Sequence, residues 1–504
     1  MKTICIQDLT VRDGNQSLLA TRMEREDILT LAAALDKVGY HSMEVWGGAT
    51  FDSAYRFLNQ SSWDILRDIR KVAPNTKLSM LLRGQNIVGY RHYDNDILER
   101  FIRLTIENGI DIIRCFDALN DIENIRHAFS YVKKYNAHLQ AAIAYTVSPV
   151  HSNEYYIDLV KKYEELGADS ICIKDMSGII SPENAGELVR TLKQVTDLPI
   201  NMHSHTTAGL TQLVMIEAMK AGVDCIDGCI SPFSGGTSHI ADGTLLAIAD
   251  QLGLSSDIDR DALSDAYEVA NKIADKYIAR GDYRTRSLIS NPKIFEYQLP
   301  GGMLSNLISQ LEEQGAADRL TEVLQEVPRV REDMGYPPLV TPLSQMVGSQ
   351  AVLNVLTGER YKVSPSEIKT YLTGGYGRPP ARIDEDFRRK ILGSDQPFVP
   401  SNSDLLEPEY EKNFAYLEGL LGREPLEEEV VAYTIFPGPV EEYMRRNELA
   451  TVQPEENPVA DVDPATEPVA KSAPVMQSAN MRTYRIAVGD DEYLVELEEV
   501  SEGS

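Results

Sequence analysis

An alternation of apolar, strand-like runs with amphipathic segments over the first 250 residues most constrains the fold of this chain. Glycines follow several of the amphipathic segments, at Gly39, Gly109, Gly167 and Gly222, where helices commonly end. Eight strand–helix repeats of about 30 residues predict a closed parallel (β/α)8 barrel, the TIM barrel. An open doubly wound sheet is the alternative, but it favours a glycine fingerprint after the first strand, which this sequence lacks. The strand-like runs begin near Thr3, His41, Lys77, Asp111, His138, Asp169, Pro199 and Cys225.

The pattern changes beyond the barrel and divides the chain into four predicted parts. Residues 1–300 hold the barrel, and residues 301–450 show helical spacing interrupted by Pro and Gly pairs, which predicts a mainly helical domain. Residues 451–480 are rich in Pro, Ala and acidic side chains and contain no aromatic residue, so we expect a disordered linker. Residues 481–504 alternate as a β-hairpin that is too short to fold alone, and we expect it to dock on a partner.

The composition bears on the partners and on the location of the protein. A formal net charge of -28 argues against binding to nucleic acid, because that requires basic patches. The five cysteines are odd in number and form no Cys-x-x-Cys pair, which predicts reduced core residues in a cytoplasmic protein. The N-terminus reaches Asp8 too early for a signal peptide, and no apolar run of 18 residues predicts a membrane span.

Two histidines at the end of the seventh strand-like run suggest a metal site. His203 and His205 are two residues apart, so their side chains leave one face of the strand about 7 Å apart along it, and they can share a divalent ion. Asp13, at the end of the first run, is a candidate third ligand, although it can instead pair with Arg12. Lys174 ends the sixth run, but an ammonium group has no lone pair, so a salt bridge to Asp13 or Asp175 is its default role.

Other polar residues converge on the same rim, because active sites of such barrels lie at the carboxyl ends of the strands. Arg83 follows the third strand and suits bidentate binding of a small carboxylate. A divalent metal beside an arginine-bound 2-oxo acid lowers the free energy of an enolate, whose carbon can gain or lose a carboxyl group. The hydroxyl of Thr237 is a candidate for relaying the proton.

Eight ordered motifs resemble one family, the biotin-dependent carboxyltransferases that act on pyruvate and oxaloacetate. Its members include the α subunit of oxaloacetate decarboxylase, the 5S subunit of transcarboxylase and the carboxyltransferase domain of pyruvate carboxylase. The likeness covers about residues 1–440. The motifs are Arg12-Asp13-x-x-Gln16, WGGATFD (46–52), LLRGQNxxGY (81–90), FDALND (116–121), IKDM (173–176), HSHTTAG (203–209), GGTSH (235–239) and PGGMLSNL (300–307).

The resemblance implies roles for individual residues. Asp13, His203 and His205 match metal ligands, and Lys174 matches a lysine that the family carbamylates into an anionic ligand. The metal is usually zinc, and sometimes cobalt or manganese. The groups that match substrate or biotin contacts are Arg12, Gln16 and Arg83 for the 2-oxo acid, Tyr90 and Arg83 for biotin, Asp52 on the biotin side, and Thr237 as the proton shuttle. Asn15 departs from the family, which commonly has histidine there.

The same resemblance implies a partner and a reaction. No biotin attachment motif is visible, so biotin is expected in trans on a carrier subunit, with an enolpyruvate formed at the metal. The first choice is the α subunit of oxaloacetate decarboxylase, with membrane decarboxylase subunits as partners. The alternatives are a transcarboxylase 5S subunit, which works with an acyl-CoA carboxyltransferase subunit, and the B subunit of pyruvate carboxylase. A metal-dependent acyl-CoA lyase or synthase and a non-catalytic scaffold remain further alternatives, and a homodimer or larger assembly is expected.

Overall fold

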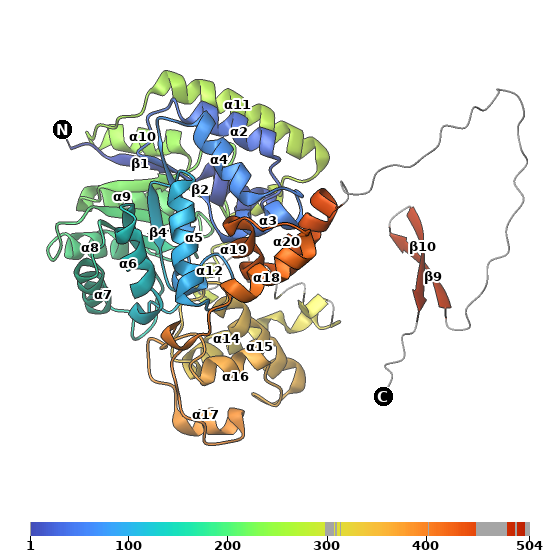
Figure 1. Ribbon diagram of the computed structural model, residues 1–504. Helices are drawn as coiled ribbons and strands as arrows, with labels where there is room; N and C mark the ends of the chain where they lie inside the picture. Colours follow the sequence, from blue (N-terminus) through green and yellow to red (C-terminus); the bar gives the residue numbers. More distant parts are fainter. Residues whose placement is uncertain are drawn as a thin grey trace, which may run out of the picture. The chain divides into compact units, whose positions relative to one another are not determined.

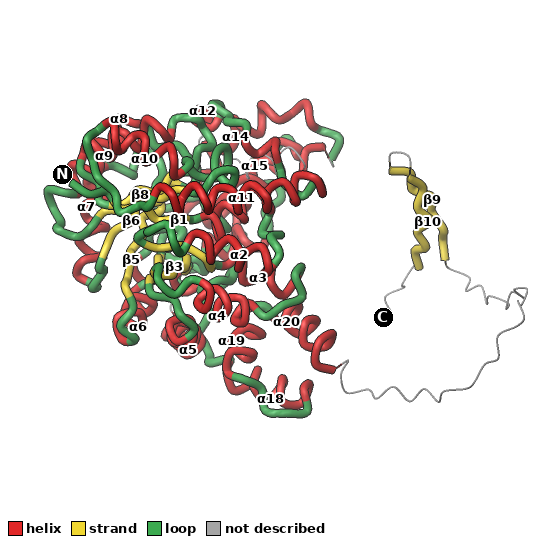
Figure 2. The backbone as a smooth tube through the Cα atoms, turned by 90° about the horizontal axis from the view of Figure 1, so that it is seen from above, coloured by secondary structure: helices red, strands yellow, loops and turns green. Residues whose placement is uncertain are grey.

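Eight parallel strands close into a barrel in the computed structural model, in the order β1 to β8 with β8 paired to β1. Figure 2 shows the strands surrounded by helices. The structure describes residues 2–297, 307, 310–312, 314–401 and 403–449, and the backbone of 481–488 and 491–498. The strands are β1 (Cys5–Asp8), β2 (Ser42–Trp46), β3 (Lys77–Leu82), β4 (Ile112–Cys115), β5 (His138–Ala144), β6 (Ser170–Asp175), β7 (Ile200–Ser204) and β8 (Cys225–Gly228).

A helix follows each strand and covers the outside of the barrel. Serine or aspartate side chains cap the amino ends of several helices, including Ser61 before α4 and Asp94 before α5. The four glycines expected to end helices all have positive φ angles, between 86° and 111°, a conformation that glycine adopts without strain. The helices are α2 (Arg25–Leu35), α4 (Ser62–Val72), α5 (Asn95–Glu107), α6 (Arg126–Lys134), α7 (Asn153–Glu165), α8 (Pro182–Leu192), α9 (Thr211–Ala221), α10 (Asp242–Gln251) and α11 (Arg260–Arg280).

Short helical segments sit in the loops at the carboxyl ends of the strands. The π-helical turn Thr10–Gly14 follows β1 directly and carries Arg12 and Asp13, and such turns occur often at functional sites. The others are α1 (Asn15–Leu19), α3 (Gly48–Arg56), the 3-10 turns Gly84–Asn86, Ile122–Asn124 and Thr285–Leu288, and α12 (Ile294–Tyr297).

The helices after the barrel pack in two groups (Figure 1). The first group forms a second hydrophobic core, separate from that of the barrel, and the second group packs into the barrel core, with Phe436 stacked on Phe51. The first group contains α14 (Leu320–Asp333), α15 (Leu343–Thr357), α16 (Ser366–Leu372) and α17 (Glu385–Leu392), with the 3-10 turn Ala317–Arg319 ahead of α14. The second contains α18 (Tyr410–Leu421), α19 (Glu427–Ile435), α20 (Pro437–Met444) and the terminal turn Arg445–Leu449, with the 3-10 turn Ser403–Leu405 ahead of it.

Polar contacts attach the first helical group to the loops at the mouth of the barrel. Asn124 donates from Nδ2 to the carbonyl of Tyr376 at 3.0 Å, and Asp121 accepts the backbone N–H of Arg378 at 2.7 Å. Val340, just before α15, packs with Leu81 and other apolar residues at the mouth of the barrel. The mouth is therefore bounded on one side by a segment far away in the sequence.

The expected C-terminal hairpin is present as an antiparallel pair, β9 (Met481–Val488) and β10 (Asp491–Glu498), in a unit of its own. The expected linker, residues 451–480, lies outside the described residues, as do residues 300–306 of the PGGMLSNL motif. Among the helices of the described residues, none combines the length and apolar character that crossing a membrane requires.

An aromatic cluster between the barrel and α19 offers a test of this packing. Trp63 is 1 % exposed, packs on Trp46, Phe51 and Phe101, and donates from Nε1 to the carbonyl of Glu428 in α19 at 3.1 Å. We expect Trp63→Ala to lower the stability by about 3–5 kcal/mol, as large-to-small core changes do. Trp63→Phe, the matched control, keeps an aromatic ring and loses the hydrogen bond, worth about 1 kcal/mol. Denaturant unfolding of both variants measures this, and equal midpoints would contradict the role of the ring packing.

Candidate active site at the carboxyl ends of the strands

Four side chains of the types that bind metals meet above the barrel. Asp13 comes from the turn after β1, His203 and His205 from the end of β7, and His239 from the loop after β8. Their ligand atoms all lie within 4.8 Å of one another. The sequence patterns predicted three of these four residues as metal ligands, whereas His239 appeared only within the GGTSH motif and was given no ligand role.

The three imidazoles share one orientation. Each Nδ1 faces an acceptor outside the cluster: Asp227 Oδ2 at 2.7 Å for His203, the Thr237 carbonyl at 2.7 Å for His205, and the Ser204 carbonyl at 3.2 Å for His239. Each Nε2 faces Asp13 Oδ2, at 3.8, 3.6 and 3.0 Å respectively. An acceptor on Nδ1 leaves the Nε2 lone pair directed inward, which is the usual arrangement of metal-binding histidines.

The protonation of these groups fits a cation between them. Burial lowers the pKa of His205 to about 3 and that of His203 well below its usual value, so both rings are neutral. Burial alone would raise the pKa of Asp13, but the charge of Arg12, its ion-pair partner, holds that pKa well below its usual value. The cluster thus combines a carboxylate with imidazole lone pairs, a donor set that suits Zn²⁺ and similar ions.

Lys174 lies beside this cluster rather than in an ion pair. Its Nζ is 2.8 Å from Nε2 of His203, and burial lowers its pKa to about 8. Asp175, one of its two expected salt-bridge partners, instead accepts the backbone N–H groups of Ile179 and Ile180. The structure therefore brings Lys174 to the histidine pair, where a buried amine is easier to deprotonate than an exposed one.

Arg12 forms an ion pair with Asp13, so the role predicted as the alternative to metal binding is also present. The guanidinium donates to Asp13 Oδ2 at 2.9 Å, to Glu44 Oε1 at 2.5 Å and to Gln16 Oε1 at 3.3 Å. Asp13 is thus shared between Arg12 and the histidines, while Arg12 is balanced by two carboxylates.

A buried charge network beneath the cluster was not anticipated from the sequence. Arg114 is fully buried and donates to Asp227 Oδ2 at 2.5 Å, and it lies 3.4 Å from Glu44. The sequence feature that could have revealed this network is a charged residue inside each of three apolar strands: Glu44 in β2, Arg114 in β4 and Asp227 in β8. A charge at such a position points to a functional interior, because charged side chains are seldom fully buried without partners.

A pocket of about 420 Å³ opens above the cluster. Its wall includes Arg12, Asp13, Gln16, Arg83, Lys174 and Thr237 from the barrel loops, together with Thr341, Ser344 and Gln345 from the first helical group. No residue after the barrel was predicted from the sequence to line the site. Asn15 lies elsewhere: it is buried, and its Oδ1 accepts the backbone N–H of Met23 at 3.2 Å.

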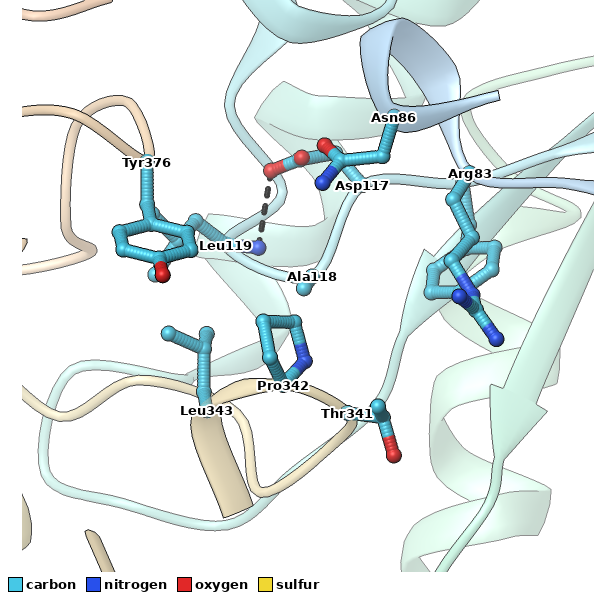
Figure 3. A pocket seen from close by; sticks show the side chains of 10 residues that line it. Arg83, Asn86, Asp117, Ala118, Leu119, Thr341, Pro342, Leu343 and Tyr376 are labelled. Atoms are coloured by element: carbon cyan, nitrogen blue, oxygen red, sulfur yellow. Dashed lines mark hydrogen bonds between the residues drawn. The ribbon is translucent and has the colours of Figure 1, made fainter. Parts of the chain in front are cut away.

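Arg83 lines both the main pocket and a smaller one of about 20 Å³, and Figure 3 shows the smaller one. Its Nη1 donates to the Gly89 carbonyl at 2.9 Å, and its guanidinium lies 5.2 Å from the ring centre of Tyr90, which is half exposed. Asp117 lines the smaller pocket, where burial raises its pKa to about 7. Asp52 lines neither pocket, and its carboxylate pairs with Arg56 at 3.0 Å.

Two threonine hydroxyls line the main pocket. Thr237 donates from Oγ1 to the Ser17 carbonyl at 3.3 Å. Thr341 accepts from Gln345 Nε2 at 3.3 Å, and among the described residues its own hydroxyl proton has no acceptor. The hydroxyl proton of Thr237 is therefore engaged by a backbone carbonyl, whereas that of Thr341 has no acceptor among the described residues.

Known proteins share this architecture. The HMGL-like family profile matches residues 3–270, and the profile described as "Conserved carboxylase domain" matches residues 294–500. The B subunit of pyruvate carboxylase from Methanocaldococcus jannaschii is 47 % identical over 90 % of this chain and 80 % of its own length. The 2-oxoglutarate carboxylase large subunit of Hydrogenobacter thermophilus is 41 % identical over 90 % and 70 %. The methylmalonyl-CoA carboxyltransferase 5S subunit of Propionibacterium freudenreichii is 42 % identical over 86 % of both chains.

A solved structure shares the whole arrangement. The carboxyl transferase domain of Rhizobium etli pyruvate carboxylase, determined with pyruvate and biocytin, superimposes with a TM-score of 0.81 at 31 % identity. The match covers 88 % of this chain and 77 % of that domain, whereas the match to a longer pyruvate carboxylase chain from the same organism covers 41 % of that chain. Both the barrel and the helical domain predicted from the sequence are therefore confirmed, and the chain belongs to the family of biotin-dependent carboxyltransferases.

Proposed function

We propose that this chain is the carboxyltransferase subunit of a two-subunit carboxylase, moving a carboxyl group between carboxybiotin and a 2-oxo acid. One observation carries the proposal: the Asp13 and histidine cluster shares a single pocket with Arg83, which has no carboxylate partner among the described residues. A metal site next to an uncommitted guanidinium is the arrangement that binding and activating a small 2-oxo acid requires.

The relatives bear on the choice between members of the family. The three named above are a B subunit of pyruvate carboxylase, a 2-oxoglutarate carboxylase large subunit and a carboxyltransferase 5S subunit. These names favour the alternatives weighed from the sequence over the α subunit of oxaloacetate decarboxylase, the first choice. We therefore place the chain with the carboxylase subunits, acting on pyruvate or a larger 2-oxo acid. The conserved carboxylase domain at residues 294–500 argues against an acyl-CoA lyase.

The metal ligands that we propose are Asp13, His203 and His205, with His239 added from the structure and Lys174 next to them. A divalent metal held there supplies a Lewis acid for the keto oxygen of the substrate. Asp227 and the Thr237 carbonyl hold the two β7 histidines in place, and Arg12 keeps Asp13 ionised. Zinc is our first choice, with cobalt or manganese as alternatives, because the donor set does not separate them.

Arg83 and Gln16 are the groups that we propose for the substrate carboxylate. Burial lowers the pKa of Arg83 from its usual value, yet the guanidinium stays charged and faces the pocket. Arg12 is balanced by Asp13 and Glu44, so its role is to position Gln16 and Asp13. Tyr90 lies over Arg83 and suits the flat ring system of biotin. Asp52 is paired with Arg56, so we give it no direct contact with biotin.

We propose Thr341 as the proton relay and Thr237 as a positioning residue. The sequence predicted Thr237 for the relay, but that hydroxyl donates to Ser17 while its carbonyl holds His205. Thr341 lines both pockets and keeps its proton available among the described residues. General acid–base groups act through such an available proton within reach of the reacting atoms.

The remaining predictions concern partners, location and domain boundaries. We propose that biotin arrives on a carrier subunit and that the C-terminal hairpin, within residues 481–504, pairs with it through an exposed strand edge. The boundaries 1–300, 301–450, 451–480 and 481–504 stay predictions, and so do a cytoplasmic location and a homodimer or larger assembly. Free cysteines at all five positions accord with that location.

The metal assignment predicts the outcome of removing one imidazole. We expect wild-type protein to carry about one divalent ion per chain, and His203→Ala to lose both the ion and the exchange of pyruvate protons, because too few ligands remain. His239→Ala weakens the metal affinity by about 10–100-fold if His239 is a ligand or orients Asp13. Elemental analysis after dialysis measures both. His138→Ala, at the opposite end of its strand, is the control, and full metal content in His203→Ala would refute the ligand set.

The proton relay is tested by a pair of threonine variants. We expect Thr341→Ala to keep the metal and to slow carboxyl transfer by about 10²–10⁴, the range for lost acid–base catalysis. Thr237→Ala should have a smaller effect on kcat, because the backbone carbonyl that holds His205 is retained. Single-turnover transfer to pyruvate from carboxybiotin measures both rates. The reverse order of effects would assign the relay to Thr237.

The docking role of the hairpin is tested by truncation. Residues 1–452 form one compact unit and residues 453–504 another, so we expect the truncated chain to remain folded. It should transfer a carboxyl group from free carboxybiotin at the rate of the full chain and lose transfer from carrier-bound carboxybiotin. Undiminished transfer from the carrier would remove the hairpin from docking, whereas loss of both activities would show that it supports the site itself.

A further inference from the structure

A second guanidinium without a carboxylate partner among the described residues lines the main pocket. Arg284 contributes to its wall, is exposed, and pairs with no carboxylate within 4.0 Å among the described residues. The other cations there are engaged differently: Arg12 contacts Asp13 and Glu44, and Lys174 faces His203. Arg83 and Arg284 are thus two guanidiniums in one pocket that have no carboxylate partner among the described residues.

Backbone contacts hold Arg284 next to the cluster. Its N–H donates to the Leu18 carbonyl at 2.9 Å, which ties it to α1 just beyond Gln16. Three residues later, the Ser287 carbonyl accepts the N–H of Thr237 at 2.9 Å. The packing there is tight, since a Cβ atom on Gly236 would lie 1.9 Å from that carbonyl oxygen. The segment is therefore fixed against the loop whose Thr237 carbonyl holds His205.

The two guanidiniums that lack a carboxylate partner come from different sides of the pocket. Arg83 follows β3, whereas the segment of Arg284 is bound to the chain after β1 and after β8. A monocarboxylate such as pyruvate occupies one of them at a time. A substrate with two carboxylates occupies both, and each guanidinium can then make paired charge-assisted hydrogen bonds. The pocket, at about 420 Å³, has room for the longer molecule.

We propose that Arg284 binds the distal carboxylate of a 2-oxo dicarboxylate and so selects a 2-oxo diacid over pyruvate; this rests on the proposed function. In the reaction a C3–H bond of the substrate breaks and a C3–C bond to the transferred carboxyl carbon forms. The N–C bond of carboxybiotin breaks, and the biotin nitrogen receives the proton. No oxidant or reductant is required. Arg284 takes no part in these steps and acts on specificity alone.

The test compares two acids that differ in the distal carboxylate. 2-Oxoglutarate has it, and 2-oxopentanoate has the same chain length without it. In the metal-loaded full chain we expect 2-oxoglutarate to bind more tightly than 2-oxopentanoate by roughly tenfold to a hundredfold, the effect of hydrogen bonds to a charged group. Arg284→Gln should abolish that ratio and Arg284→Lys should restore part of it. Titration calorimetry gives the ratio, and deuterium exchange at C3 gives the matching KM values.

The controls separate this proposal from its rivals. Arg286→Gln, an exposed position outside the pocket lining, should leave the ratio unchanged. A wild-type ratio near one, or a ratio unaffected by Arg284→Gln, overturns the proposal. If Arg284→Gln instead raises only the KM for carboxybiotin, the arginine serves the carboxyl donor and the proposal is wrong. Failure of metal-loaded wild type to exchange C3 protons of any 2-oxo acid, even with biotin present, overturns the proposed function itself.

Discussion

The carboxylate of Asp227 sets the geometry on which the site depends. It is fully buried at the end of β8, accepts from Arg114 at 2.5 Å, and accepts the Nδ1 proton of His203 at 2.7 Å. Because that proton is held on Nδ1, the Nε2 lone pair of His203 must face Asp13 and Lys174. The position of the metal-binding atoms is therefore decided one layer below them, inside the barrel.

The balance of charge in this layer favours a cation above it. Two guanidiniums, Arg12 and Arg114, stand against three carboxylates, Asp13, Glu44 and Asp227, and all five are nearly or fully buried. These five groups carry one surplus negative charge, which the buried Lys174 balances only while its amine is protonated. Buried ion pairs add little net stability, because desolvation offsets their attraction. A network of this kind is better explained by function, and its surplus carboxylate charge lies where the imidazole lone pairs converge. A divalent ion there would satisfy both.

Local patterns in the sequence predicted the barrel but only part of the site. Each strand begins within two residues of its predicted start, and the spacing of His203 and His205 put both on one face of β7. His239 was recognised only as part of the GGTSH motif, because no pattern in the neighbouring sequence shows that the loop after β8 turns back to Asp13. Arg114 and Asp227 were not predicted as site residues, although each is a charged residue inside an apolar strand. Only closing the barrel brings them together, because inward-facing side chains of distant strands then share one interior.

The helical domain was predicted as a separate domain with no residue in the site, and the structure shows that the segment at the start of α15 lines the main pocket. Val340 packs with Leu81 and Phe116 in the apolar ring at the mouth of the barrel, which fixes the segment that begins α15. The neighbouring Thr341 and Ser344 are thereby carried over the pocket. The barrel supplies the charged groups, while this segment supplies hydroxyls and an apolar wall. Under the proposed function, this division would separate two tasks: the charged groups would hold the 2-oxo acid and its metal ion, and the segment would face the carboxyl donor. The sequence did not place this segment in the site, because about 100 residues separate Thr341 from His239 along the chain and no short pattern links them.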